Sequence, residues 1–133
     1  MRGEPRSMQA DPQYDDVVVD VRNFLQHSEA SALAAGIARE RLILDPGFGF
    51  GKTFAHNQQL FQALPELVRL QLPVLVGVSR KAMIGHVVDK PVNERMVGSV
   101  AAAMLAAQYG AAIVRVHDVP ETIDALKMLQ ALG

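Results

Sequence analysis

Side chains able to bind ions or move protons follow three short apolar segments of this sequence. Asp45 comes directly after Leu-Ile-Leu, and Ser79 and Lys81 follow Val-Leu-Val-Gly-Val. Arg115 and His117 end the segment Ala-Ala-Ile-Val-Arg-Val-His. Binding sites in barrels and open sheets lie at the C-terminal ends of parallel strands. If the three segments are such strands, their polar side chains are predicted to share one site.

A glycine-rich segment, Leu-Asp-Pro-Gly-Phe-Gly-Phe-Gly-Lys-Thr, raises the question of a phosphate-binding loop. A P-loop needs a glycine five residues before Gly51, but that position holds Pro46, which has no amide hydrogen. The next helix is also expected to begin near Asn57, too far from Lys52 to put its N-terminus under phosphates. A P-loop is therefore disfavoured, and Lys52 is expected on the surface.

The glycine spacing does not fit a dinucleotide fold either. Gly47, Gly49 and Gly51 are spaced G-x-G-x-G, and no acidic residue ends a later strand about 20 residues on. A tight turn remains, in which Phe48 is expected to fill the core. Asp45, expected to be buried at the end of its strand, still needs hydrogen-bond donors or a cation. Backbone amides of the turn or a bound ligand would supply them.

Composition narrows the class of partner. The chain has 133 residues, half of them apolar, with thirteen basic and fourteen acidic side chains and no cysteine. The charge balance disfavours a nucleic-acid or membrane-surface partner and favours small molecules. The apolar stretches fall short of the roughly 20 residues that a membrane span needs. Together with the polar opening of the chain, these features predict a single cytoplasmic domain.

Alternating helix and strand patterns must position the polar residues. Gly36 and Gly110 are expected to end helices, Pro65 to interrupt one, and Asp118 with Glu121 to cap the last one. The patterns predict helices over 15–35, 57–68, 80–88, 93–110 and from about 118 onward, and strands over 41–45, 73–79 and 111–118. This order predicts an α/β fold with a parallel sheet, in which three strands are too few to close a barrel.

Three motifs in this order resemble dihydropteroate synthase, the folate-pathway enzyme family that joins a pterin to p-aminobenzoate: LDPGFGFGK, VGVSRKAMIG and RVHDV. The resemblance covers the whole chain, and the opening MRGEPRSMQ resembles the segment after the fifth barrel strand of the family. It implies a TIM-type (β/α)8 barrel, a fold of roughly 250 residues. Residues 1–133 would then be a single partial pterin-binding domain, with about strands six to eight and their helices.

The resemblance assigns substrate contacts to five residues. Asp45 would accept hydrogen bonds from the amino-pyrimidine edge of the pterin, and Lys81 would donate to its ring near the incoming amine. Gly77 would let the backbone approach the pterin. Ser79 would hold the carboxylate of p-aminobenzoate, or cap the short helix that follows, and Phe50 would pack on the aminobenzoate ring.

Arg115 and His117 alternate with two valines, so both are expected on one face of the last strand. By the resemblance, Arg115 would stack on the pterin and bind the diphosphate, and His117 would add a donor to the same leaving group. A structural role for His117 is as compatible with the sequence. The remaining histidines, which have no partner pattern, are His27, His56 and His86.

The family's Asn near the metal and other early-loop residues have no counterpart in this chain. The Mg²⁺ that the resemblance implies would therefore be bound outside it, and no metal site is expected here. Catalysis is assigned to Lys81, Arg115 and His117, the substrates to a pterin diphosphate and p-aminobenzoate, and the full-length assembly to a homodimer. Two alternatives stay open: a non-catalytic half-barrel that joins a partner chain, and a phosphate- or pterin-binding module without chemistry.

Overall fold

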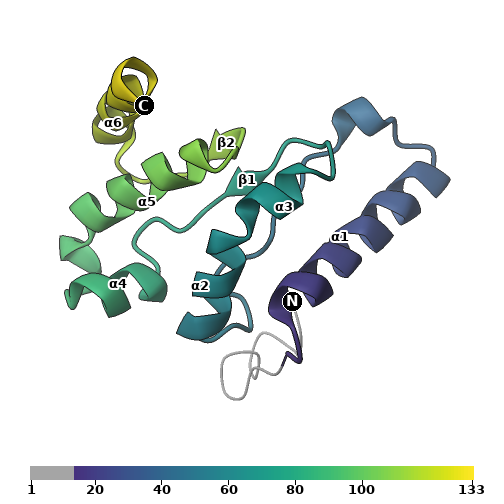
Figure 1. Ribbon diagram of the computed structural model, residues 1–133, viewed down its shortest axis with the longest axis horizontal. Coiled ribbons are helices and arrows are strands. Elements are labelled where there is room, and N and C mark those ends of the chain that lie inside the picture. The colour runs from purple at the N-terminus through teal and green to yellow at the C-terminus, as the bar shows by residue number, and fades with distance from the viewer. Residues whose placement is uncertain (1–13) are drawn as a thin grey trace.

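The structure is a computed structural model that describes residues 14–133 (Figure 1). The predicted relation between MRGEPRSMQ and the segment after a fifth strand lies outside these residues. The elements are α1 (Val17–Ala34), η1 (Arg39–Arg41), α2 (Phe54–Gln62), α3 (Leu64–Val68), β1 (Leu75–Val76), α4 (Ala82–Val88), η2 (Val92–Glu94), α5 (Met96–Gln108), β2 (Ile113–Val114) and α6 (Val119–Leu132). Helices thus alternate with extended segments, as predicted, but β1 and β2 are shorter than the strands predicted over 73–79 and 111–118.

Three parallel segments lie side by side. Strand β1 pairs with β2, with Leu75 opposite Ile113, and Leu44 forms a parallel bridge with Val74 on the other side. The predicted strand over 41–45 is therefore wrong in length, since only Leu44 pairs. Its backbone N–H donates to the carbonyl of Pro73 at 2.8 Å. In residues 14–133 this segment has no partner strand on its outer side, which leaves its other backbone groups out of a ladder.

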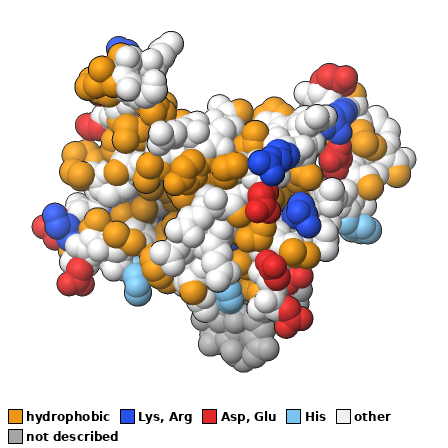
Figure 2. Space-filling view, in the orientation of Figure 1, with side chains coloured by type: hydrophobic (Ala, Val, Ile, Leu, Met, Phe, Trp, Pro, Cys, Tyr) orange, Lys and Arg blue, Asp and Glu red, His pale blue; other side chains and the backbone are white. Residues whose placement is uncertain are grey.

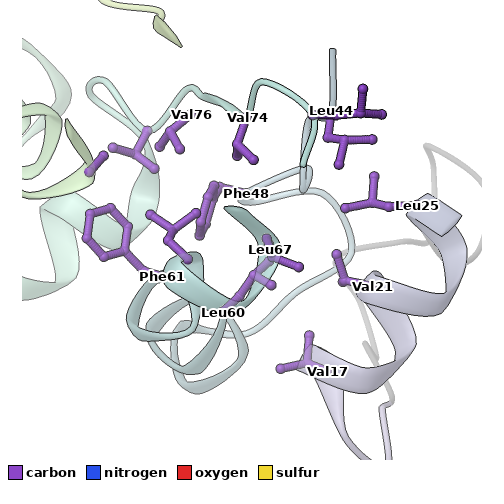
Figure 3. Close-up of a cluster of buried hydrophobic side chains, with 14 of the residues drawn as sticks. Val17, Val21, Leu25, Leu44, Phe48, Leu60, Phe61, Leu67, Val74 and Val76 are labelled. Carbon is purple, nitrogen blue, oxygen red and sulfur yellow. The ribbon is translucent and has the colours of Figure 1, made fainter. Parts of the chain in front are cut away.

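One face of the three segments forms the core. Leu44, Val74 and Val76 are buried there, and Figure 3 shows them above side chains of α2 and α3 that include Leu60 and Leu67. The core is extended by Phe48 from the glycine turn, as predicted, and by Val17, Val21 and Leu25 from α1. This face is apolar because it packs against helices on its whole length.

The opposite face of the same segments has little cover. Side chains alternate along a strand, so residues next to the buried ones point the other way. Ile43 is 51% exposed and Ile113 is 38% exposed, although both are large and apolar. We call this the inner face, and its residues are Ile43, Asp45, Leu75, Gly77, Ile113 and Arg115. Asp45 and Arg115 are exposed as well, whereas Leu75 is half-buried and Gly77 is buried.

Two predicted helix boundaries are confirmed. Gly36 follows α1 with φ +91°, and its N–H donates to the carbonyl of Leu33. Pro65 stands in the first turn of α3, so the predicted interruption is real. A proline is tolerated there because the first amides of a helix have no partner within the helix.

The predicted start near Asn57 is wrong, because α2 begins at Phe54. Thr53 caps it: its Oγ1 accepts the N–H of His56 at 3.1 Å, and Nδ1 of His56 accepts the N–H of Thr53 at 3.0 Å. This reciprocal capping box is the reason for the early start.

The predicted capping pair of Asp118 and Glu121 is also wrong. Asp118 precedes α6 but makes no side-chain cap, because its Oδ1 accepts a hydrogen bond from Nη2 of Arg80 at 2.8 Å. Helix α6 packs against α5. On the face drawn in Figure 2, hydrophobic side chains gather over α5, and charged ones lie over α3 and α1. Within residues 14–133, no helix combines the length and apolarity needed to cross a membrane.

Candidate active site

Five of the seven predicted site residues line one cavity of about 260 Å³ at the C-terminal ends of β1 and β2. The parallel pairing of the two strands brings their ends to the same edge, which is why residues far apart in sequence meet. The lining residues are Gly77, Ser79, Lys81, Arg115, Val116 and His117. Asp45 and Phe50 line a neighbouring cavity of about 500 Å³, between the glycine turn and α1.

Asp45 is exposed, so the expectation that it is buried is wrong. It lies on the inner face, which has little cover among the described residues. Its Oδ1 accepts the N–H of Gly47 at 2.9 Å. The glycine turn therefore supplies one hydrogen-bond donor to Asp45 from its own backbone. This is one of the two sources of donors that the sequence left open, the other being a bound ligand. The predicted contact with a pterin is compatible with this arrangement, since the carboxylate also faces the larger cavity.

Lys81 lies near both the acidic residue Asp45 and the basic residue Arg115 of the site. Its Nζ donates to the carbonyl of Phe48 at 2.7 Å and lies 4.9 Å from the centroid of the Phe50 ring. The pKa of Lys81 is lowered, first by burial and then by the charge of Arg115, while Asp45 opposes the shift. A lysine in this setting can donate hydrogen bonds to a ring system at the edge of the cavity.

Phe50 and Lys81 share a third cavity of about 370 Å³, which also includes Met83 and His86. Phe48 is buried, as the sequence predicted, and Phe50 is exposed. His86 stacks on Phe54 with ring centroids 4.0 Å apart. The sequence suggested no partner for His86, whereas the structure pairs it with Phe54. The two stacked rings form one wall of this cavity.

Arg115 lies against the backbone of Gly77. A Cβ at Gly77 would be 2.9 Å from Nη2 of Arg115 and 3.1 Å from its Nε. Only glycine therefore lets the guanidinium lie flat on the end of β1 without a shift. The close approach of Gly77 to a pterin stays a prediction.

Ser79 contacts His117 across the two strands. Its Oγ lies 2.7 Å from Nδ1 of the imidazole and accepts the backbone N–H of His117 at 3.2 Å. Ser79 is not the N-cap of the following helix, because α4 begins at Ala82 and its N-cap is Lys81. The capping alternative is thus wrong. Of the other histidines, His27 lies exposed on α1 and His56 takes part in the capping box.

Lys52 is buried, so its predicted surface position is wrong. It is 4% exposed, and its Nζ donates to the carbonyls of Gly47 at 2.7 Å and Phe50 at 3.1 Å. Burial, followed by the charge of Lys81, lowers its pKa to about 8, and Asp45 opposes the shift. Lys52 thus holds the glycine turn closed from inside, a role that the sequence alone did not suggest.

The glycine turn can wrap around Lys52 because its glycines adopt left-handed conformations. Gly47, Gly49 and Gly51 have φ values of +74°, +87° and +65°, which other residues adopt at a cost. The buried Asn57 adds a further contact, since its Oδ1 accepts the N–H of Gly49 at 2.9 Å. The placement of Asp45 and Phe50 at the two ends of this turn depends on these internal contacts.

A second cluster, made of polar contacts, is centred on Arg80, which follows Ser79 of the site. The sequence analysis does not predict this cluster. This residue has φ +58°, and its N–H donates to Oγ of Ser99 at 2.8 Å. Its guanidinium pairs with Asp118, and its carbonyl accepts from Nη1 of Arg95 at 3.0 Å. The Arg95 guanidinium also occupies the space beside Gly85 that a side chain would need. These contacts hold the loop between β1 and α4, and no local sequence signal reveals them.

Comparison with known proteins places this geometry in a family. A family profile described as "Pterin binding enzyme" matches residues 1–117. The dihydropteroate synthase of Haemophilus influenzae is 56% identical over 131 residues, which cover 98% of this chain and 48% of that protein. The one from Escherichia coli is 48% identical, over 98% of this chain and 46% of that protein. The chain thus spans about half the length of the curated relatives it matches.

Solved structures give the same result for the fold. The dihydropteroate synthase of Yersinia pestis in a sulfonamide drug complex superposes with a TM-score of 0.95 at 51% identity, over 98% of this chain and 48% of that one. The enzyme of Xanthomonas albilineans in complex with 7,8-dihydropteroate gives 0.89 at 52% identity, over 91% and 47%. The resemblance seen in three motifs and the partial barrel are thereby confirmed. The chain belongs to the pterin binding enzyme family and forms part of its TIM-type (β/α)8 barrel.

Proposed function

We propose that this chain forms one wall of the active site of a dihydropteroate synthase-like transferase. The proposed reaction joins (7,8-dihydropterin-6-yl)methyl diphosphate to p-aminobenzoate and releases diphosphate. The observation that carries the proposal is the convergence of Lys81, Arg115 and His117 on one cavity at the strand ends. Cationic groups and N–H donors in a partly enclosed site stabilise the charge that develops on a departing diphosphate.

The leaving group is assigned to Arg115 and His117. A guanidinium offers two parallel N–H donors to phosphate oxygens, and its flat position on Gly77 fixes the direction of that fork. His117 adds a donor from the same side of the strand. Together they would hold diphosphate at the point where β2 ends, in keeping with the phosphate sites found after the last strands of such barrels.

The two organic substrates are assigned to the adjoining cavities. The pterin would place its amino-pyrimidine edge on Asp45, with Lys81 donating to its ring. The p-aminobenzoate ring would pack on Phe50, beside Lys81 and in the cavity of about 370 Å³. Ser79, which the resemblance assigns to the aminobenzoate carboxylate, lies in the smaller cavity with His117 and not beside Phe50.

The proposed chemistry has two bond changes. The bond between the pterin methylene carbon and the diphosphate oxygen breaks, and the electron pair leaves with diphosphate. The resulting cation is delocalised into the pterin ring. The amine nitrogen of p-aminobenzoate then forms a bond to the methylene carbon and loses one proton. Stabilisation of the diphosphate is the main demand on the protein, and Arg115 and His117 are placed to meet it.

The Mg²⁺ implied by the family has no fitting set of ligands among the described residues. Residues 14–133 contain no group of three or more histidine, cysteine, aspartate or glutamate side chains that could hold a metal ion. If the reaction uses Mg²⁺, we propose that its ligands come from outside this chain. A homodimeric assembly and a cytoplasmic location are likewise proposals; the resemblance supports the first, and the composition of the chain supports the second.

The proposal is tested by completing the barrel. This chain would be fused to the part of the Haemophilus influenzae relative that it does not match, and formation of dihydropteroate would be measured. We call the fusion the completed barrel. It is expected to turn over, and the Asp45→Ala variant to lose that activity. A completed barrel that is folded, as judged by a cooperative thermal transition, but forms no product would contradict the proposal.

Lysine variants test the assignment of the pterin. Lys81→Ala in the completed barrel is expected to weaken pterin binding, by about 1 to 3 kcal/mol for the loss of one charged donor. Lys127→Ala, on the exposed side of α6, is the matched control. Equal affinities of the two variants in direct titration would remove Lys81 from the site.

A second candidate is a non-catalytic binding module that works with a partner chain. The open inner face, with Ile43 and Ile113 exposed, favours it. In that case the chain would recover its fold with a partner half but give no turnover, and diphosphate binding would persist in Asp45→Ala. Native mass spectrometry together with the turnover assay separates the two functions.

A further inference from the structure

The hydroxyl of Ser79 makes two contacts, and both are with His117. Its Oγ lies 2.7 Å from Nδ1 of the imidazole and accepts the backbone N–H of the same residue at 3.2 Å. Ser79 is only 8% exposed, so water competes little for these contacts. Because ring and backbone of one residue both reach one oxygen, the two contacts favour one orientation of the His117 ring, although His117 itself is exposed.

The shorter contact could run in either direction, since a hydrogen on Nδ1 could also donate to the second lone pair of the hydroxyl. Its direction is inferred from the need of the hydroxyl proton for an acceptor, because the alternative leaves that proton without one among the described residues. A hydroxyl has one proton to donate and two lone pairs to accept with. One lone pair takes the backbone N–H of His117. In the part of the chain that the structure describes, Nδ1 of His117 is the acceptor within reach of the Ser79 proton. A ring nitrogen that accepts this proton carries no hydrogen itself, so a neutral His117 must hold its hydrogen on Nε2.

We infer that Ser79 is a positioning residue that fixes His117 in its Nε2–H form and so presents one N–H donor to the cavity shared with Arg115. The inference rests on the proposed function, in which that cavity receives the diphosphate. His117 and Arg115 stand two residues apart on one side of the strand, and their donors would meet on the same leaving group. A neutral imidazole without this contact would divide its hydrogen between both nitrogens.

The inference conflicts with the contact that the resemblance assigns to Ser79. A hydroxyl proton given to Nδ1 is not free for the carboxylate of p-aminobenzoate. Direct binding of that substrate and positioning of His117 therefore predict different behaviour of Ser79 variants. The difference appears in the tautomer of His117 and in whether the effect of Ser79 depends on His117.

The tautomer is measured without any turnover. The completed barrel, labelled with ¹⁵N-histidine, would be examined by NMR near pH 8, above the ordinary histidine pKa of about 6.5. The His117→Gln variant identifies the signals. We expect Nε2 to be protonated and Nδ1 to be the unprotonated nitrogen in an accepted hydrogen bond, with Ser79→Ala losing the hydrogen-bond signature and Ser79→Thr keeping it. Protonated Nδ1 in the parent protein would overturn the inference.

A double-mutant cycle tests the functional part. Ser79→Ala is expected to lower kcat by roughly tenfold with little change in the KM of p-aminobenzoate. In the His117→Ala background the same change should cost nothing further, because Ser79 acts through the ring. Additive losses, or a raised KM for p-aminobenzoate in both backgrounds, would show that Ser79 binds substrate directly. If the completed barrel has no activity at all, the proposed function fails while the NMR result on the tautomer still stands.

Discussion

The planar guanidinium of Arg115 lies against the backbone of Gly77, in space that a side chain at position 77 would need. We predict that Arg115→Lys in the completed barrel lowers kcat/KM by more than roughly tenfold, although the charge is kept. An ammonium neither lies flat on the strand nor binds diphosphate through two parallel donors. Steady-state kinetics with the pterin diphosphate varied is the measurement. A value close to that of the parent would mean that Arg115 acts as a point charge.

Lys52 makes the free energy of unfolding depend on pH. Its pKa is lowered from 10.5 to about 8 in the folded chain. Between these values the unfolded chain holds more protons on Lys52 than the folded one, so stability should rise as the pH increases from 8 towards 10. Below pH 8 both states are protonated, and the full cost of a buried charge is present. We predict that Lys52→Met reduces this rise to the part that comes from other groups such as Lys81, whose pKa is also lowered.

The measurement for Lys52 is the urea midpoint of the completed barrel and its variants at several pH values. The charged groups that face Lys52 are Lys81 and Asp45, and both remain in the variant. Lys127→Met, which removes an exposed lysine on α6, controls for a general change of net charge. Curves that stay parallel for the parent and Lys52→Met would show that Lys52 does not cause the pH dependence.

Lys52 and Asp45 differ in burial from what the sequence predicts, because the surroundings of both side chains are set by the tertiary structure and not by neighbouring residues. The types and order of Asp45, Lys81 and Arg115 were enough to place them at one edge, because the chemistry of a strand end is local. The burial of Lys52 is not local, since it follows from three glycine conformations that curl the turn around its ammonium. Asp45 was expected to be buried because its neighbours are aliphatic, and it is exposed because it points to the uncovered inner face.

Gly77 directly follows strand β1, and its lack of a side chain leaves room for the Arg115 guanidinium. We predict that Gly77→Ala in the completed barrel weakens binding of inorganic pyrophosphate, because the new Cβ would meet Nη2 of Arg115 at 2.9 Å and push the guanidinium off the strand. In the Arg115→Ala background the same alanine should change the affinity little. Isothermal titration of the four proteins is the measurement. An equal loss in both backgrounds would mean that residue 77 itself approaches the ligand.

The order of elements could be predicted because apolar periodicity and helix-ending glycines are local signals. A predicted helix cap is wrong where a side chain makes a tertiary contact in place of the local hydrogen bond. Asp118 was expected to cap α6 but pairs with Arg80 from another strand end. Thr53, a usual N-cap residue, is the local sequence signal for the early start of α2. The short pairing near Leu44 reflects a sheet edge, which the residues themselves do not encode.

The 133-residue chain by itself is predicted to form no dihydropteroate. Its inner face exposes Ile43 and Ile113, and the segment of Leu44 and strand β2 are both sheet edges among the described residues. Open edges and apolar faces favour self-association. We therefore expect oligomers or low stability on native mass spectrometry and thermal unfolding. Turnover by the purified chain that disappears in Asp45→Ala would contradict the prediction and would mean that copies of the chain complete the site.

The contact of Arg95 with Gly85 bears on how relatives of this chain can diverge. The Arg95 guanidinium fills the space beside Gly85 and at the same time donates to the carbonyl of Arg80. A side chain at position 85 would therefore displace the arginine from the Arg80 carbonyl, whereas the same change after the arginine has become smaller would meet no such conflict. Substitutions at the two positions should covary across the family, with glycine retained wherever the arginine is present.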